Sequence, residues 1–289
     1  MNKSLRESIK EAGEKGVAIG HFNVSNLEGV YAIAEAAENL KVPVIIGVSE
    51  GERDFTGVKI IAAVVKSLKA EKNLPIFLNA DHTYSIERVK EAIDAGFDSV
   101  IFDGAQLSME ENISKAKECV AYAKSQTRDV IVEGELGYIG TSSKVLTEIP
   151  EGAAINDAML TSTIDAKKFV EETGVDMLAP AVGNIHGMFG KAKDPALNIG
   201  RVGEISEITQ IPLVLHGASG NSDADVQEAI KAGVRVVHVN TELRVAFRKG
   251  LEEALSAHPD EVSPYKYLKI ARDSMKKVVE EKLRVFNNL

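Results

Sequence analysis

Short apolar runs alternate with amphipathic segments along almost the whole chain. Eight of the runs are continuously hydrophobic and bounded by turn signals, as expected for strands of a parallel sheet that is buried on both faces. The predicted strands are residues 17–23, 42–48, 75–82, 98–103, 129–135, 178–181, 212–215 and 234–239. Eight strand–helix units without a break favour a closed (β/α)8 barrel, although a doubly wound open sheet would show the same local pattern.

Helical segments fill the intervals between these strands. Several begin with capping signals, including Asn26 and the capping box that starts at Ser108. Two long loops remain, a segment of about 28 residues after Glu135 and residues 183–198, and loops of that length in a compact domain are commonly functional. We expect one barrel domain over residues 1–289, with 263–289 as a C-terminal helical extension.

Length and charge narrow the classes of function. The 289 residues suit one α/β barrel, which commonly fills about 250 residues. A net charge of −9 argues against a nucleic acid or an anionic membrane as the main partner. The single cysteine, Cys119, falls on the apolar positions of a helix and is expected to be a buried structural thiol. The chain has no signal-peptide core or run of transmembrane length, so we expect a cytoplasmic protein.

Side chains that carry chemistry follow nearly every predicted strand. The carboxyl ends of the strands of such a barrel meet at one mouth. In chain order the residues there are Asn23, Ser49, Asp81, His82, Asp103, Glu135, His186, His216, His238 and Asn240. Strand ends meet water and are often polar, but that alone does not explain four histidines with three carboxylates. The pattern therefore predicts a metal site.

Three histidines are the expected ligands of that metal. Neutral imidazoles suit zinc, and a catalytic zinc keeps three protein ligands and one open position, which His82, His186 and His216 could provide. Asp103 and Glu135 could bind a displaced or second cation, or orient the imidazoles by hydrogen bonds. His21 and His258, in contrast, are expected to be structural and solvated, respectively.

A glycine-rich segment predicts a phosphate site beside the metal. Residues 216–220 read His-Gly-Ala-Ser-Gly, and Asn240-Thr241 opens the next helix at the neighbouring strand end. Glycines allow close approach of the backbone to an anion, and the loops after strands seven and eight are the usual phosphate site of this barrel. No predicted strand ends in lysine, so a Schiff-base mechanism is not expected.

These motifs together resemble the class II, metal-dependent fructose-bisphosphate aldolase family, which includes the tagatose-bisphosphate aldolases. The resemblance extends from Phe22-Asn23-Val24 to the C-terminal helix. Its most specific pieces are Asp81-His82, Glu133-Gly134-Glu135-Leu136-Gly137, Gly183-Asn184-Ile185-His186-Gly187 and Leu215-His216-Gly217-Ala218-Ser219-Gly220.

The resemblance implies a role for each matching position. His82, His186 and His216 would hold catalytic zinc, with Asp103 and Glu135 around an alternative metal position. Asp81 corresponds to the residue that transfers the proton of the C4 oxygen. The positions that resemble the substrate and phosphate contacts are Asn23, Ser49, Gly187, Gly217, Ser219, His238, Asn240 and Thr241. A monovalent cation, sodium or potassium, is implied at the phosphate site.

Three positions depart from the family pattern. Ser143 stands where the family has the acid that moves the C3 proton, and Glu148 or Glu151 could replace it. His238 replaces an amide that contacts the reacting triose, and could hydrogen-bond or add a metal ligand. Asn240 occupies a position linked to the choice of sugar.

A fourth difference lies after His186, the second of the three expected metal-binding histidines. The lysine expected four residues after it is absent, because Gly190 stands there and Lys191 comes one residue later.

The expected activity is reversible cleavage of fructose 1,6-bisphosphate to dihydroxyacetone phosphate and glyceraldehyde 3-phosphate, as in glycolysis and gluconeogenesis. Tagatose 1,6-bisphosphate or another phosphorylated ketose is the alternative substrate. A non-catalytic paralogue that binds metal and phosphate and, more weakly, a metal-dependent hydrolase are alternatives of a different kind. A homodimer or homotetramer is expected.

Overall fold

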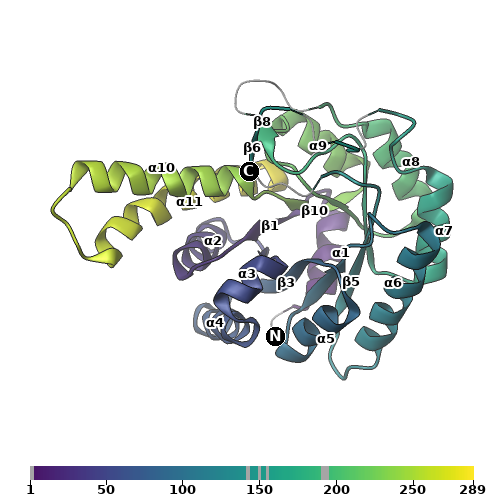
Figure 1. The fold of residues 1–289 in the computed structure, drawn as a ribbon, viewed down its shortest axis with the longest axis horizontal. Helices are drawn as coiled ribbons and strands as arrows, with labels where there is room; N and C mark the ends of the chain where they lie inside the picture. The colour runs from purple at the N-terminus through teal and green to yellow at the C-terminus, as the bar shows by residue number, and fades with distance from the viewer. Residues whose placement is uncertain (1–2, 141–143, 149–150, 154–155, 190–194) are drawn as a thin grey trace.

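The computed structural model describes residues 3–140, 144–148, 151–153, 156–189 and 195–289. Eight parallel strands form a closed barrel in the order β1-β2-β3-β4-β5-β7-β9-β10, with β10 paired to β1 (Figure 1). The barrel strands are β1 (Ile19–Asn23), β2 (Val44–Val48), β3 (Ile76–Thr83), β4 (Ser99–Phe102), β5 (Ile131–Leu136), β7 (Met177–Pro180), β9 (Leu213–Leu215) and β10 (Val234–His238). The predicted (β/α)8 barrel is confirmed, and the alternative of a doubly wound open sheet is excluded.

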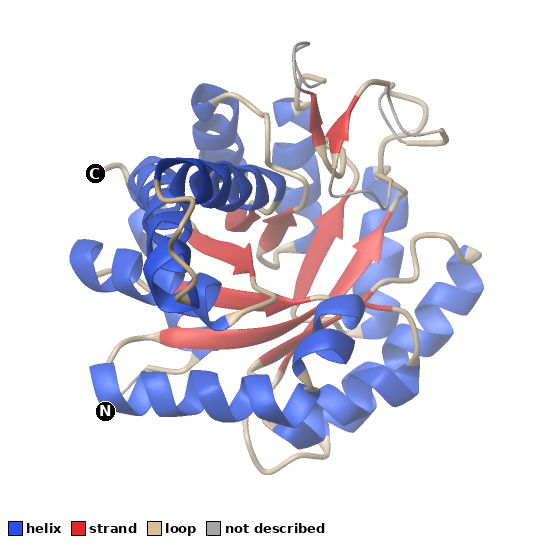
Figure 2. Ribbon diagram, turned by 60° about the vertical axis from the view of Figure 1, so that its left-hand side comes forward, coloured by secondary structure: helices blue, strands red, loops and turns tan. Residues whose placement is uncertain are grey.

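Helices surround the barrel on its outside (Figure 2). They are α1 (Leu5–Lys15), α2 (Leu27–Leu40), α3 (Glu50–Thr56), α4 (Val58–Lys72), α5 (Ile86–Ala95), α6 (Met109–Lys124), α7 (Thr163–Thr173), α8 (Ile199–Thr209), α9 (Asp223–Ala232), α10 (Thr241–Ala257) and α11 (Pro264–Asn287). None of these helices is both long enough and apolar enough to cross a bilayer in the described part of the chain.

Three elements, one short helix and a pair of short strands, were not expected from the sequence. The short helix α3 follows β2 directly, because Ser49 and Glu52 form a capping box at its start. In the predicted long loops, β6 (Val145–Leu146) and β8 (Met188–Phe189) pair as a small parallel sheet above the barrel (Figure 2). Both additions lie at the carboxyl ends of the strands and enclose that mouth.

Apolar and polar residues divide the barrel interior along its axis. Towards the amino ends of the strands, Phe77 and its interior neighbours pack against Leu5 and Ile9 of α1, which closes that end. Towards the carboxyl ends, the interior side chains are polar or ionisable, including His21, Asp81 and Glu133, all buried. The apolar half stabilises the barrel. The side chains that could take part in catalysis therefore lie at the carboxyl ends of the strands.

The last two helices form an antiparallel pair that extends to one side of the barrel (Figure 1). The base of α11 is attached to the barrel by buried side chains such as Leu283 and Phe286. The Phe286 ring stacks on Phe22 of β1, and the backbone N–H of Ala18 donates to the carbonyl of Phe286. The C-terminal helix thus packs directly against the strand that carries Asn23.

Candidate active site

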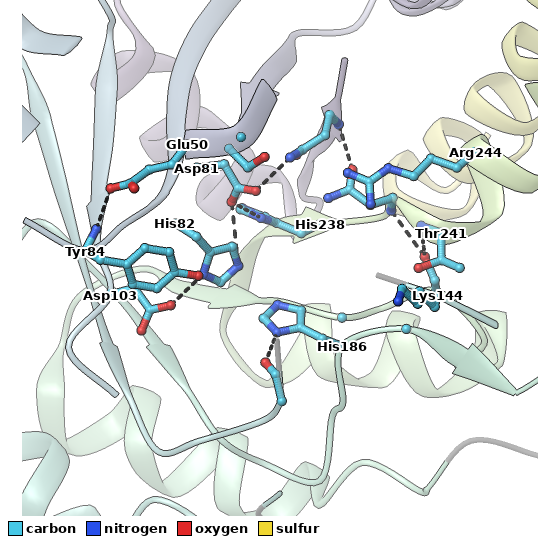
Figure 3. A pocket seen from close by; sticks show the side chains of 18 residues that line it. Glu50, Asp81, His82, Tyr84, Asp103, Lys144, His186, His238, Thr241 and Arg244 are labelled. Atoms are coloured by element: carbon cyan, nitrogen blue, oxygen red, sulfur yellow. Dashed lines mark hydrogen bonds and ion pairs between the residues drawn. The ribbon is translucent and has the colours of Figure 1, made fainter. Parts of the chain in front are cut away.

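A cavity of about 380 Å³ opens at the carboxyl mouth of the barrel (Figure 3). Most of the side chains and glycines that the sequence singled out line it. These are Asn23, Ser49, Asp81, His82, Asp103, His186, Gly187, Gly217, Ser219, His238, Asn240 and Thr241. The two others, Glu135 and His216, are buried beside the cavity and lie 3.3 and 3.2 Å from the His82 ring nitrogens. The structure therefore brings all of the predicted site residues together.

Each of the three predicted metal-binding imidazoles has one nitrogen held by a neighbouring oxygen. His82 Nδ1 lies 2.9 Å from Asp103 Oδ2, and His216 Nε2 lies 2.7 Å from Glu133 Oε1. His186 Nδ1 bonds the carbonyl of Gly140. These contacts orient the rings and leave His82 Nε2, His186 Nε2 and His216 Nδ1 for a shared ligand.

The spacing of these nitrogens fits a tetrahedral metal ion. His82 Nε2 and His216 Nδ1 are 3.2 Å apart, and potential ligand atoms of all three histidines lie within 4.8 Å of one another. Nitrogens bound at about 2.0–2.1 Å to a tetrahedral zinc are separated by about 3.3 Å. The three rings could hold zinc with little rearrangement.

The buried carboxylates also fit a cation. Burial and the charges of Asp81 and Glu135 raise the pKa of Glu133 well above its usual value. Burial and the charge of Asp103 raise the pKa of Glu135 to about 7. A bound metal ion would supply positive charge that favours the ionised forms. Without a metal, these buried carboxylates lack a positive charge that would stabilise their ionised forms.

The histidines differ in charge because their neighbours differ. Burial lowers the pKa of His186 to about 4, so its imidazole is neutral at pH 7, as a metal ligand must be. Burial has the same effect on His82, but the charges of Asp81 and Glu135 and the hydrogen bond with Asp103 outweigh it and raise its pKa well above the usual value. In the metal-free site, His82 is therefore the one of the three imidazoles that is protonated on both nitrogens and positively charged.

Asp81 is buried at the end of β3, next to the predicted metal. Its Oδ2 accepts a 2.7 Å hydrogen bond from Asn23 Nδ2, and its Oδ1 lies 3.8 Å from His82 Nε2. Burial alone would raise the pKa of Asp81, but His82 and His238 hold it well below its usual range. The carboxylate is thus ionised, and its Oδ1 has no hydrogen-bond partner in the described chain.

A clamp around Arg53 fixes the strand end that carries Asp81. The guanidinium of Arg53 is buried and donates to the carbonyls of Val48 and Asp81 and to Thr83 Oγ1. His82 lies between Asp81 and Thr83, the two residues of β3 that Arg53 contacts. It has a φ of +35°, a conformation that non-glycine residues rarely adopt. The strained backbone turns the imidazole towards the other histidines while Asp81 keeps its place in the strand.

His238 lies in a column of three stacked imidazoles. Its ring centroid is 3.5 Å from that of His21 and 4.1 Å from that of His216, with interplanar angles of 2° and 19°. Ligand lone pairs lie in the ring plane, so rings stacked in this way cannot both point at one ion. His238 Nδ1 lies 3.6 Å from Asp81 Oδ1, which favours a role in positioning over metal ligation.

His21, expected to be structural, is buried at the far end of this column. Its Nε2 lies 3.0 Å from Asn79 Oδ1. The ring fits because residue 47 is glycine: a Cβ there would lie 2.1 Å from His21 Cε1. The exposed His258 lies at the end of α10, remote from the column.

Glycines and a serine form the predicted phosphate cradle. Gly217 has a φ of +60°, and a Cβ there would lie 2.1 Å from the carbonyl oxygen of Ile185, so only glycine fits. Ser219 Oγ accepts hydrogen bonds from the backbone N–H groups of Asn240 and Thr241. The hydroxyl proton of Ser219 is then directed elsewhere and could be donated to a phosphate.

Several residues of the mouth were missed by the sequence interpretation. Tyr84, Glu50, Lys144 and Arg244 line the cavity, and Glu52 lies behind it. Glu52 could have been found, because it is three residues after Ser49 in a capping-box pattern. Lys144, which also lines the cavity, was not part of any motif in the sequence.

The expected replacements for the C3 acid are not brought to the cavity in the described part of the chain. The side chains of Glu148 and Glu151 are exposed and do not line it. Ser143, like Gly190 and Lys191, lies outside the described residues.

Comparisons with known proteins identify the family of this chain. A model of the family "Fructose-bisphosphate aldolase class-II" matches residues 3–289. The chain belongs to the class II fructose-bisphosphate aldolase family. It is therefore an enzyme of the lyase class, from a family that is generally metal-dependent and acts on phosphorylated sugars.

Individual members of this family match over nearly their full length. The chain is 40% identical to a "Probable fructose-bisphosphate aldolase" of Bacillus subtilis, covering 99% of this chain and 97% of the relative. It is 38% identical to a fructose-bisphosphate aldolase of Geobacillus stearothermophilus, with 99% and 96% covered. The crystal structure of the YdjI aldolase from Escherichia coli K12 is similar with a TM-score of 0.81 at 30% identity, covering 99% and 97% of the two chains.

We predict that zinc affinity increases with pH between about 6 and 8. The raised pKa of His82 and the pKa of about 7 for Glu135 mean that zinc must displace protons at the lower pH. Each displaced proton changes the apparent affinity by up to about tenfold per pH unit. A competition titration with a fluorescent chelator measures this, with His258→Ala as a control that should retain the dependence. Equal zinc affinities at about pH 6 and pH 8 would contradict the prediction.

Proposed function

We propose that this enzyme is a zinc-dependent aldolase that reversibly cleaves fructose 1,6-bisphosphate to dihydroxyacetone phosphate and glyceraldehyde 3-phosphate. The observation that carries the proposal is the convergence of His82, His186 and His216, with an ionised Asp81 beside them. A phosphate cradle borders the same cavity. A metal-dependent hydrolase would need no such cradle.

The proposed cleavage divides the work between the metal and Asp81. When bound, zinc supplies Lewis acidity that polarises the C2 carbonyl of the ketose. The Asp81 carboxylate accepts the proton of the C4 hydroxyl as the C3–C4 bond breaks, and the C4 half leaves as an aldehyde. The electron pair of that bond remains with the C3 half, which becomes dihydroxyacetone phosphate once C3 gains a proton.

Asn23 and His238 keep Asp81 in position for this step. The amide of Asn23 donates to Asp81 Oδ2 and, with the same nitrogen, to Glu52 Oε2. His238 lies near the other carboxylate oxygen and is held by its ring stack. In the described chain, Oδ1 of Asp81 has no hydrogen-bond partner, and we assign this oxygen as the proton acceptor.

The C1 phosphate is assigned to the cradle of Gly187, Gly217, Ser219 and Thr241. All four line the cavity on the side of β7, β9 and β10. Lys144 adds a positive charge to the same cavity (Figure 3), and a sodium or potassium ion at the phosphate could add another. We assign fructose rather than tagatose because the curated relatives are named fructose-bisphosphate aldolases.

Removal of the metal should abolish cleavage. We expect zinc-loaded protein to cleave fructose 1,6-bisphosphate, a chelator to stop the reaction, and added zinc to restore it. Borohydride with substrate should label no lysine, because no Schiff base forms. A parallel assay with tagatose 1,6-bisphosphate tests the alternative sugar. Activity that survives chelation would contradict the proposal, and zinc binding without any turnover would favour a non-catalytic paralogue.

Replacement of Asp81 should separate turnover from metal binding. We predict that Asp81→Ala binds zinc but loses catalysis by about 100-fold or more, since general acid–base catalysis contributes about that much. His216→Ala, in contrast, should lose zinc. Asp260→Ala, at an exposed position between α10 and α11, is the matched control and should behave as wild type. A fully active Asp81→Ala enzyme would exclude the proton-transfer role.

A further inference from the structure

The proposed cleavage needs a second proton transfer besides the one made by Asp81. Asp81 takes the proton of the C4 hydroxyl, whereas the C3 half keeps the electron pair of the broken bond and must gain a proton at C3. The group that gives this proton has to line the cavity and be able both to hold a proton and to release it. Lys144 meets these conditions in the described chain (Figure 3).

Strand pairing holds Lys144 beside the phosphate cradle. It comes directly before β6, in which Val145 pairs with Met188 of β8. The backbone N–H of Met188 donates to the carbonyl of Lys144 at 3.1 Å. Lys144 is therefore held alongside Gly187, the cradle residue that precedes Met188, and both line the cavity.

The cradle residue Gly187 directly follows the predicted metal ligand His186. The backbone N–H of His186 donates to the carbonyl of Ile139 at 2.9 Å, and its Nδ1 bonds the carbonyl of Gly140. Lys144 thus starts from the side of the mouth where metal and cradle meet. With the C1 phosphate in the cradle and the C2 carbonyl at the metal, the adjoining C3 lies within reach of a flexible four-carbon side chain that begins here.

The ammonium group of Lys144 is not used by another contact. Its side chain is exposed and has no hydrogen-bond or ion-pair partner among the described residues. Two carboxylates of the cavity are engaged elsewhere, since Glu50 accepts from the backbone N–H of Tyr84 and Asp103 lies 2.9 Å from His82 Nδ1. An unpaired ammonium can donate to a substrate, and contact with water lets it regain a proton after each turnover.

Other proton-bearing side chains of the cavity suit the transfer less well. Arg244 is not deprotonated in proteins. Burial raises the pKa of Tyr84 to about 12, which makes its phenol a weak acid, and Tyr84 follows β3 rather than the strands of the cradle. His82 gives up its extra proton when it binds a metal.

We propose that Lys144 is a catalytic residue that transfers the proton at C3. In cleavage, an N–H bond of its ammonium group breaks as the C3–H bond forms, and the nitrogen keeps the electron pair of the N–H bond. In the reverse direction, the neutral amine takes a proton from C3 of dihydroxyacetone phosphate. The inference rests on the proposed aldolase function and assigns this step to an amine instead of a carboxylate.

Proton exchange with solvent tests this step in the absence of the aldehyde. Dihydroxyacetone phosphate in deuterium oxide should lose its C3 proton signal in the NMR spectrum when zinc-loaded enzyme is added. At saturating substrate, Lys144→Met should slow this exchange by about 100-fold or more. Lys144→Arg should be as slow, because a guanidinium keeps the charge but does not release a proton. Calorimetry measures the binding of dihydroxyacetone phosphate, which Lys144→Arg should retain.

Chemical rescue separates proton transfer from a structural role. The thiol introduced by Lys144→Cys can be alkylated with bromoethylamine, which restores an amine on a chain of similar length. Cys119 should not react, because it is buried and burial raises its pKa to about 12. Alkylation before zinc loading should speed exchange by about tenfold or more relative to the untreated variant.

Lys117→Met is the matched control, because Lys117 is an exposed lysine of α6 that does not line the cavity. It should exchange at the wild-type rate. Lys144→Met or Lys144→Arg exchanging at the wild-type rate when saturated, or an alkylated Lys144→Cys that recovers nothing, would overturn the role of Lys144. Failure of the aldolase proposal looks different: zinc-loaded wild type would neither cleave fructose 1,6-bisphosphate nor exchange the proton, and this inference would fall with it.

Discussion

Backbone hydrogen bonds between β1 and β10 close the parallel sheet, with His21 opposite His238 in register. This closure brings residues from distant parts of the sequence to one mouth, so that Asp81, His186 and His216 surround a single cavity. It also places His21 and His238 side by side on neighbouring strands, which is why their rings stack. Without the closed register, neither the histidine cluster nor the imidazole column would exist.

Electrostatic balance is the second constraint on the mouth. Asp81, Glu133 and Glu135 are buried close together, and burial and the charges of neighbouring carboxylates raise the pKa values of the two glutamates. A divalent cation on the three imidazoles would relieve this repulsion. The same buried carboxylates orient the rings, so the interactions that destabilise the metal-free site prepare it for a metal.

The sequence predicted the fold and identified residues that reach the mouth, because both depend on local pattern. Buried parallel strands are continuous apolar runs in the sequence. The residue that follows each run lies at the carboxyl end of its strand, so its side chain is expected at the mouth. His82 and Asp81 were found in this way, and their positions agree with the prediction. Predicted boundaries differed from the observed ones by one to a few residues, as at the first strand, predicted from residue 17 and observed from Ile19.

Other residues could not be found because their positions depend on packing between elements. Arg244 lies inside an ordinary helix, and nothing in its local sequence indicates that it reaches across the mouth to Glu52. Arg53 and the ring stack of His21 with His238 depend equally on contacts between distant segments. Tertiary contacts of this kind have no periodic signature in the sequence.

Direct observation of the metal tests the central claim, that one ion is held by the three histidines at the mouth. Zinc-edge anomalous diffraction from crystals of the zinc-loaded protein gives the position of the ion and its ligands. The account predicts one zinc bound by His82 Nε2, His186 Nε2 and His216 Nδ1 at about 2.0–2.1 Å, with one position left for a light-atom ligand. Zinc bound elsewhere, or without His186, would contradict it.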